Sequence, residues 1–424
     1  MTLFCANGRS DSLVVEGRVV SPTQGVDEAL RITVVDGVIT GIEPAGSNGL
    51  VIAPAFIDPH VHMRTPGRED EETLRSGTEA AAAGGYCAIL AMPNTDPVVD
   101  SAAVLGALVE RARGEARVPI GFMAAISKGQ RGEELTEMVE LAMTGAAAFT
   151  DDGRPVASAG IMRRALQYSA LAKLPLALHC EEPSLSRGGH AHEGAVSAEL
   201  GLGPYPSVAE SVMVERDLAL AGLEERPVHL MHLSARESVA ALDHARGKGS
   251  AATAEVTPHH LVLTDEAVRS LDPNMKMNPP LRSGDDRAVL RDALRRGAIS
   301  CIATDHAPHA RHEKDVPFEE APFGVTGLET AFAVLYTHLV IPGELSLETL
   351  LERMSAGPAK VFGLDEPKIE IGALANLVVL DLDAEWTVTE EGFRSLSANS
   401  WLLGEKLRGQ VVQTVADGRV VFAA

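Results

Sequence analysis

Eight short apolar runs between residues 55 and 304 alternate with segments of helical composition, and this alternation constrains the fold more than any other feature. The helical segments are rich in Ala, Leu, Glu and Arg, as in EETLRSGTEAAAAGG and ESVAALDHARGKG. Short apolar runs between helices are typical of βαβ units that build a parallel sheet. Eight such units predict a closed (β/α)8 barrel of the α/β class. The predicted strands cover residues 55–58, 87–92, 119–126, 146–150, 174–179, 228–233, 251–256 and 299–304.

Both ends of the chain are rich in β-branched residues instead. LRITVVDGVITGIEP and VVQTVADGRVVFAA each place Asp-Gly between β-branched runs, which predicts a hairpin turn in each. We therefore expect residues 1–54 and 363–424 to pair into one small, β-sandwich-like domain built from both termini. Residues 55–362 are then expected to form the barrel.

Charge and composition indicate the class of partner. The 424-residue chain has a formal net charge of −22, which argues against binding a nucleic-acid backbone. No apolar stretch is long enough to predict a membrane-spanning helix, and the N-terminus has no signal-peptide pattern. The four cysteines form no CxxC pair, which is typical of proteins from a reducing cytosol. We expect a cytoplasmic protein that acts on a small molecule, with neither nucleic acid nor membrane as a partner.

Histidines and carboxylates follow several of the predicted strands. Barrel enzymes hold their active sites at the C-terminal ends of the strands, so we expect these side chains to meet. A strand edge, a turn or a helix cap explains each residue taken alone, but these explanations would have to hold at five strands independently. Alternate side chains of a strand share a face, so two histidines and an arginine after strand one are predicted to point together. The residues in question are His60, His62 and Arg64 after strand one, Asp151 and Asp152 after strand four, His179, His232, and Asp305.

Imidazole nitrogens and carboxylate oxygens are the ligands that catalytic zinc prefers. The set is large enough for two metal ions bridged by one carboxylate, which favours hydrolysis of an amide, ester or phosphate. Other conspicuous residues are predicted to have structural roles, because they lie away from the strand ends or lack a partner base. These are Cys180, His190 and His192, together with His259 and His260, for which packing or support of the site is expected.

Nine motifs together resemble the bacterial class I dihydroorotase family of the amidohydrolase superfamily. HxH alone is common to the superfamily, whereas MPNT, NPPLR and DHAPH followed by APFG are much more selective. The resemblance covers about residues 50–335. The motifs are DPHVHMRTPG, AMPNTDPVVD, FTDDG, HCEE, HEG, TPHHL, MNPPLR, ATDHAPH and APFGVTGLET.

The resemblance implies two zinc ions per subunit. His60 and His62 would bind one with Asp305, and His179 and His232 would bind the second. The superfamily often bridges its metals with a carbamylated lysine, but this chain reads AAAFTDDGRP at that place and has no lysine there. The resemblance to this form of dihydroorotase implies an aspartate bridge instead, assigned to Asp152 by the TDDG motif. Asp151 stays open, because adjacent residues of an extended chain point opposite ways.

The implied reaction is the reversible closure of N-carbamoyl-L-aspartate to L-dihydroorotate, a step of pyrimidine biosynthesis. Asp305 would carry the proton between water and the ring nitrogen, and Arg64 would grip the substrate carboxylate. The loop after strand eight is expected to close over the site. The other implied substrate contacts are Asn94, Asn278, His309 and backbone groups of Phe323 and Gly324. A homodimer is expected, and a complex with aspartate transcarbamoylase is left open.

Two alternatives remain. One is an allantoinase or hydantoinase, although those enzymes usually keep the bridging lysine and lack NPPLR. The other is a non-catalytic dihydroorotase-like subunit that scaffolds aspartate transcarbamoylase, but such proteins lose metal ligands. This chain departs from the family pattern at His312, in ARHEKDVPFEE, and at SANSWLLGEKLRG. Neither stretch holds a proposed ligand, so these departures leave the detail of the loop and of the small domain open.

Overall fold

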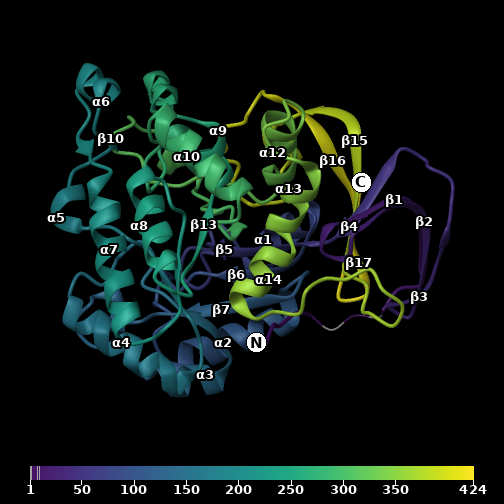
Figure 1. Cartoon of the computed structure of the whole chain (residues 1–424), viewed down its shortest axis with the longest axis horizontal. Helices are drawn as coiled ribbons and strands as arrows, with labels where there is room; N and C mark the ends of the chain where they lie inside the picture. Colours follow the sequence, from purple (N-terminus) through teal and green to yellow (C-terminus); the bar gives the residue numbers. More distant parts are fainter. Residues whose placement is uncertain (1, 7, 9) are drawn as a thin grey trace.

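The computed structural model describes residues 2–6, 8 and 10–424. Figure 1 shows a barrel of strands wrapped by helices, with a separate sheet beside it that is built from N-terminal and C-terminal strands. All eight barrel strands lie where the sequence predicts them, which confirms the (β/α)8 fold. They are β5 (Phe56–Val61), β6 (Tyr86–Ala91), β7 (Ile120–Ala124), β8 (Ala146–Phe149), β9 (Leu176–Leu178), β12 (Val228–Leu230), β13 (Thr253–Val256) and β14 (Cys301–Ile302).

The barrel sheet is parallel throughout, in the order β14-β13-β12-β9-β8-β7-β6-β5. It closes at its C-terminal end, where Val61 and His306 form a parallel bridge and the amide of His62 donates to the carbonyl of His306 at 2.8 Å. Both faces of such strands are covered, which explains their continuous apolar runs. The closure places the residues that follow β5 and β14 next to each other.

Helices cover the outside of the barrel (Figure 1). Those that follow the strands are α1 (Leu74–Ala83), α2 (Ala102–Glu115), α3 (Met138–Thr144), α4 (Ala159–Ala172), α7 (Val208–Leu223), α8 (Arg236–Gly247), α10 (Gly284–Arg295), α13 (Leu347–Met354) and α14 (Ala356–Phe362). Shorter elements lie in the loops: α5 (Pro183–Ser186), β10 (Ala191–His192), α6 (Ala195–Leu200), β11 (Pro204–Tyr205), α9 (Pro258–Val262), α11 (Arg311–Lys314) and α12 (Ala331–Leu335). None of the helices in the described part of the chain is both long and apolar enough to cross a bilayer.

The two ends of the chain pair into one seven-stranded mixed sheet. Its two Asp-Gly hairpins are confirmed, because Asp36 and Gly37 have φ of 48° and 81°, and Asp417 and Gly418 have φ of 50° and 71°. Positive φ at both central residues matches the right-handed twist of the flanking strands. The order is β17 (Arg419–Ala423), β16 (Lys406–Ala416), β15 (Leu377–Thr387), β4 (Leu50–Pro54), β1 (Leu13–Ser21), β2 (Val26–Val35) and β3 (Val38–Pro44). The domain boundaries at residues 54 and 363 stay predictions.

Candidate active site

The carboxylate of Asp152 lies at the centre of four histidines at the C-terminal mouth of the barrel. Its Oδ2 is 3.7 Å from Nε2 of His60 and 3.5 Å from Nε2 of His62. Its Oδ1 is 3.5 Å from Nδ1 of His179 and 3.6 Å from Nε2 of His232. Each carboxylate oxygen therefore faces one pair of histidines.

Asp305 completes one half of this cluster. Its Oδ1 lies 2.9 Å from Nε2 of His62 and 3.4 Å from Nε2 of His60. Asp305 and His232 both have positive φ, 49° and 32°, which is uncommon for residues other than glycine. Such strained backbone is stored where the surrounding structure holds a side chain in a required direction. All six side chains of the cluster are buried.

The structure separates the two adjacent aspartates after β8. The carboxylate of Asp151 points away from the histidines and accepts hydrogen bonds from the amides of Ile126 and Ser127, at 2.8 and 3.1 Å, and from the Ser127 hydroxyl. Asp151 is thus satisfied by the loop after β7, whereas the carboxylate of Asp152 faces the four imidazoles.

The outer nitrogens of three of these histidines are held by oxygen acceptors. Nδ1 of His60 lies 2.8 Å from Glu255, and Nδ1 of His62 lies 2.9 Å from the side-chain carbonyl of Asn94. Nε2 of His179 lies 2.8 Å from the carboxylate of Glu181. Metal-bound histidines almost always donate their second nitrogen in this way. The inner Nε2 of His60 is buried without a hydrogen-bond partner among the described residues. Together these features fit a metal site.

The pKa shifts in the cluster also favour a bound cation. Burial alone would raise the pKa of Asp152, but His60, His179 and His232 hold it well below its usual value. Burial likewise opposes the charged form of His179, yet Asp152 and Glu181 raise its pKa to about 10. Both carboxylates of the cluster, Asp152 and Asp305, are therefore anionic, and their buried position favours a cation between them.

Arg64 lies beside the cluster, but a shared strand face with His60 and His62 does not place it there. Strand β5 ends at Val61, and Arg64 has a φ of 53°, so the alternation of a strand does not extend to it. Its Nε lies 2.8 Å from Glu71 and donates to the carbonyl of Pro308 at 3.0 Å. Its Nη2 lies 3.3 Å from Nε2 of His309. The expected common strand face is thus corrected, because the backbone turns after β5 and contacts across the mouth place the guanidinium.

Asn278 and His309 line the same mouth. The side-chain amide of Asn278 donates to Glu181 at 3.1 Å, while its Oδ1 is buried without a hydrogen-bond partner in the described chain. The ring of His309 donates from Nε2 to the carbonyl of Phe323 at 2.8 Å. Burial first, and then Arg64, lower the pKa of His309 to about 3, so its ring is neutral at physiological pH. An unpartnered acceptor and a neutral imidazole suit an uncharged polar group of a ligand, such as an amide.

Gly324 supports this arrangement through its backbone. Its φ of 119° favours glycine, and an added Cβ would lie 2.6 Å from Cβ of Ala307. Its amide donates to the carbonyl of Lys276 at 2.8 Å, and its carbonyl accepts from Asn399 at 3.2 Å. The carbonyl of Phe323 likewise has a partner in His309, and the contacts of Phe323 and Gly324 with a substrate stay predictions.

Three residues that the sequence patterns do not single out support the site: Glu255 and Glu181 contact the cluster, and Asn399 contacts the loop after β14. Glu255 interrupts the apolar run AATAEV, and an acid inside a barrel strand was the signal that identifies it. Glu181 stands within the quoted HCEE motif. Asn399, in the departing segment SANSWLLGEKLRG, donates to Ala307 and Gly324 and accepts from the amide of His309 at 3.0 Å. Only the fold shows this contact, because Asn399 is 90 positions from His309.

The residues expected to be structural lie outside the cluster. The buried thiol of Cys180 has its pKa raised well above normal, first by burial and then by Asp217. His192 lies 3.3 Å from Arg282 at Nδ1, and His190 contacts the amide of Gly203. Thr257 caps α9 by accepting from the amide of His260, and the ring of His260 donates to the carbonyl of Pro279 at 3.0 Å. The ring of His259 packs at an angle of 53° against that of His260, with ring centroids 4.5 Å apart.

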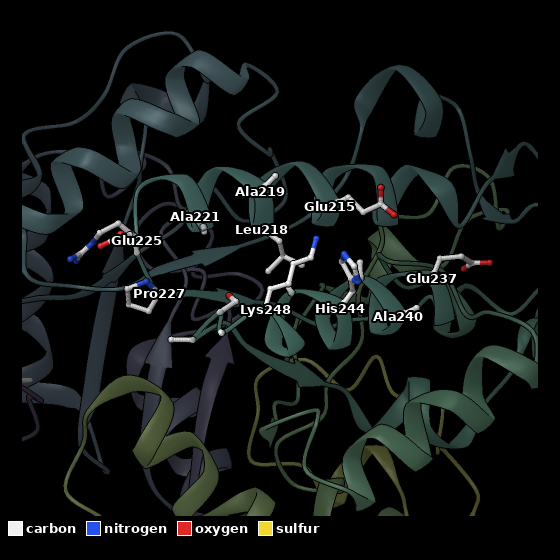
Figure 2. A pocket seen from close by; sticks show the side chains of 17 residues that line it. Glu215, Leu218, Ala219, Ala221, Glu225, Pro227, Glu237, Ala240, His244 and Lys248 are labelled. Atoms are coloured by element: carbon white, nitrogen blue, oxygen red, sulfur yellow. The ribbon is translucent and has the colours of Figure 1, made fainter.

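A groove of about 1070 Å³ also lies between α7 and α8 on the outside of the barrel (Figure 2). Glu215 and Ala219 line it from α7, and His244 lines it from α8, with Lys248 just beyond that helix. None of the six cluster residues lines this groove, so the chemistry of the mouth does not involve it.

Comparisons with known proteins agree with this geometry. Residues 49–238 match the family model described as dihydro-orotase-like, and residues 289–422 match that of the amidohydrolase family. The dihydroorotase of Anaeromyxobacter dehalogenans is 45% identical over 428 residues, covering 97% of this chain and 98% of that protein. The dihydroorotase of Geobacter metallireducens is 41% identical over 420 residues, covering 97% and 99%.

Solved structures show the same fold. The L-hydantoinase (dihydropyrimidinase) of Arthrobacter aurescens is 25% identical with a TM-score of 0.86, over 97% of this chain and 96% of that one. The dihydropyrimidinase of Brevibacillus agri NCHU1002 is 22% identical with a TM-score of 0.82, over 97% and 95%. At this identity the second match concerns the fold alone.

Proposed function

Since this chain belongs to the dihydroorotase family of cyclic amidohydrolases, we propose that it interconverts N-carbamoyl-L-aspartate and L-dihydroorotate in pyrimidine biosynthesis. The observation that carries the proposal is the meeting of four histidines with Asp152 and Asp305, beside a cationic side chain. A catalytic cluster and a carboxylate-binding arginine in one mouth suit this anionic cyclic amide.

The proposal includes two zinc ions, with Asp152 as the bridging ligand. His60, His62 and Asp305 would hold one ion, and His179 and His232 the other. The support is that each oxygen of Asp152 faces one histidine pair. When bound, the metals would lower the pKa of a water molecule and polarise the amide carbonyl.

The proton transfer is assigned to Asp305. In the hydrolytic direction, its carboxylate accepts the proton of the attacking water and returns it to the leaving ring nitrogen. Contacts with His62 and His60 hold this carboxylate at the inner edge of the mouth, at 2.9 and 3.4 Å. Asp305→Asn replaces one carboxylate oxygen with an amide nitrogen, which removes the proton acceptor while the side chain keeps nearly the same size.

The substrate groups are assigned to the outer part of the mouth. Arg64 would bind the carboxylate outside the ring, because a guanidinium grips a carboxylate with two hydrogen bonds. Oδ1 of Asn278, which has no hydrogen-bond partner among the described residues, would accept from a ring N–H. His309 and the backbone of Phe323 and Gly324 would line the other side, and Asn94 would contact both ligand and substrate. The loop after β14 would close over them.

A hydantoinase is the second candidate, because the Arthrobacter aurescens L-hydantoinase has a closely similar fold. A non-catalytic subunit is disfavoured by the complete set of buried histidines and aspartates. We also propose that the protein is a homodimer located in the cytoplasm. The four free cysteines support the location, because thiols stay reduced there. Association with aspartate transcarbamoylase is tested by co-sedimentation of the two purified proteins.

The function is tested with the zinc-supplemented protein and three substrates: dihydroorotate, hydantoin and allantoin. We expect turnover of dihydroorotate alone, with bound zinc measured by elemental analysis. Asp305→Asn should abolish turnover while the circular dichroism spectrum stays that of the wild type. Turnover of hydantoin or allantoin without dihydroorotate would show that the assigned substrate is wrong.

A further inference from the structure

We propose that Glu255 is a positioning residue for the ligand His60, and that His229 holds Glu255 in place for this role. The inference rests on the proposed metal-dependent function and extends it to a chain of buried side chains behind the site. This chain runs from Thr253, at the N-terminal end of β13, through His229 and Glu255 to His60 at the inner face of the cluster.

The contacts are continuous and shielded from water. Oε1 of Glu255 lies 2.8 Å from Nδ1 of His60, and Oε2 lies 2.9 Å from Nε2 of His229. Nδ1 of His229 lies in turn 2.8 Å from the hydroxyl of Thr253. Glu255 and His229 are each 1% exposed, and His60 is fully buried. Solvent therefore does not compete for the two hydrogen bonds of Glu255, whereas Thr253, at the far end, is half-buried.

This series of hydrogen-bonded side chains determines which nitrogen of His60 faces the cluster. A carboxylate only accepts hydrogen bonds, so Glu255 requires a proton on Nδ1 of His60. The lone pair of a neutral ring is then on Nε2, which points toward Asp152 and Asp305 and has no hydrogen-bond partner in the described chain. A carboxylate at the outer nitrogen also makes the imidazole a stronger electron donor.

Glu255 differs from the other two outer acceptors because it reaches both histidine pairs. Its Oε1 also accepts from the backbone amide of His232 at 3.3 Å, although His232 belongs to the opposite pair. The φ of His232 is 32°, and this hydrogen bond helps to hold the residue in that conformation. Asn94 and Glu181 each contact only one of the four histidines through these hydrogen bonds. Glu255 thus aligns one ligand by its ring and another by its backbone.

His229 holds the carboxylate of Glu255 in the orientation that reaches His60. Burying a carboxylate costs free energy unless each of its oxygens has a hydrogen-bond partner. A carboxylate with one unpartnered oxygen would rotate toward another donor. Nε2 of His229 occupies Oε2 and leaves Oε1 for His60. The ring of His229 is itself fixed between Thr253 and the ring of Phe362, whose centroid lies 5.1 Å away.

The test compares zinc binding by wild type and Glu255→Gln in competition with a chromophoric chelator. An amide of this shape still accepts from His60 and donates to His229, so the fold is kept while the carboxylate charge is lost. We expect roughly 10–100-fold weaker zinc binding, as for other residues that hold a metal-bound histidine. The visible spectrum of the cobalt-substituted protein should also change, because without the carboxylate charge at its outer nitrogen His60 is a weaker electron donor.

Glu329→Gln is the matched control. Glu329 also accepts from backbone amides, those of Arg394 and Ser395, but it contacts none of the six cluster residues. Its zinc affinity and cobalt spectrum should equal those of the wild type. Metal-free thermal unfolding of both variants separates a loss of fold from a loss of metal binding.

A second variant, His229→Asn, keeps the inference falsifiable if Glu255→Gln does not fold. The shorter amide does not reach Glu255, so zinc binding should weaken by several-fold. Zinc affinity within twofold of wild type in either folded variant would overturn the inference. If the wild type itself bound no zinc and did not turn over dihydroorotate, the proposed function would fail, which is a distinguishable result.

Discussion

Asp152→Asn is the sharpest perturbation of the proposed metal centre, because the two oxygens of this carboxylate face different histidine pairs. They lie 3.5–3.7 Å from the four inner nitrogens, and the side chain is 4% exposed. Asparagine would offer one neutral oxygen to one pair and a hydrogen-bond donor to the other. Both halves of the site are therefore weakened by a change of almost no volume.

The magnitude follows from the number of interactions lost. A charge-assisted contact is worth roughly 1.5–3 kcal/mol, so two such contacts cost about 3–6 kcal/mol. At about 1.4 kcal/mol per factor of ten, metal affinity should fall roughly 10²–10⁴-fold. Zinc at 1,000 times its dissociation constant stabilises the wild type by about 4.1 kcal/mol. The same zinc concentration should stabilise Asp152→Asn by roughly 1.4 kcal/mol or less.

The assay measures unfolding with and without buffered zinc, together with bound zinc and turnover. Asp151→Asn is the matched control, since its side chain is held by Ile126 and Ser127 and faces none of the histidines. It should keep the zinc-dependent stabilisation and change the metal-free stability by about 1 kcal/mol. Loss of that stabilisation in Asp151→Asn, with its retention in Asp152→Asn, would refute the assignment of the bridge.

Three further perturbations test the mouth and its loop. Arg64→Met should raise KM about 10–100-fold in steady-state assays and change kcat less, because a charge-assisted grip is lost; an unchanged KM would exclude that contact. Asn399→Ala removes three hydrogen bonds to the loop that carries His309 and Gly324, so KM should rise and amide exchange over residues 306–324 should accelerate; wild-type exchange there would contradict the role. Burial, and then Lys276, lower the pKa of Lys314 to about 7. Between about pH 7 and 10 the unfolded chain thus binds more protons than the folded protein does, so the free energy of unfolding should rise with pH there. Lys314→Met should reduce this slope by up to about 1.4 kcal/mol per pH unit in urea titrations, and an unchanged slope would show that Lys314 does not cause it.

Most of the fold was predictable because its signals are local. The alternation of apolar runs with helical segments depends on neighbours within a few turns, and it located all eight barrel strands. The Asp-Gly pairs at 36–37 and 417–418 adopt positive φ for intrinsic conformational reasons, so both hairpins followed from the sequence. The gathering of His60, His179 and Asp305 followed from one rule, that the C-terminal ends of barrel strands share one mouth.

Tertiary structure decided what local patterns leave open. Asp152 rather than Asp151 faces the histidines, because Ile126 and Ser127 in the loop after β7 hold the other carboxylate. Arg64 lies beyond the end of β5, where the period of two no longer applies, and its partner Glu71 and the carbonyl of Pro308 place it.

Glu255 and Asn399 meet the site across 195 and 90 positions of sequence, respectively. The types of ligand were therefore set by the sequence. The orientation of each ligand depends on the closed barrel, since only its packing brings distant hydrogen-bond partners within 3 Å.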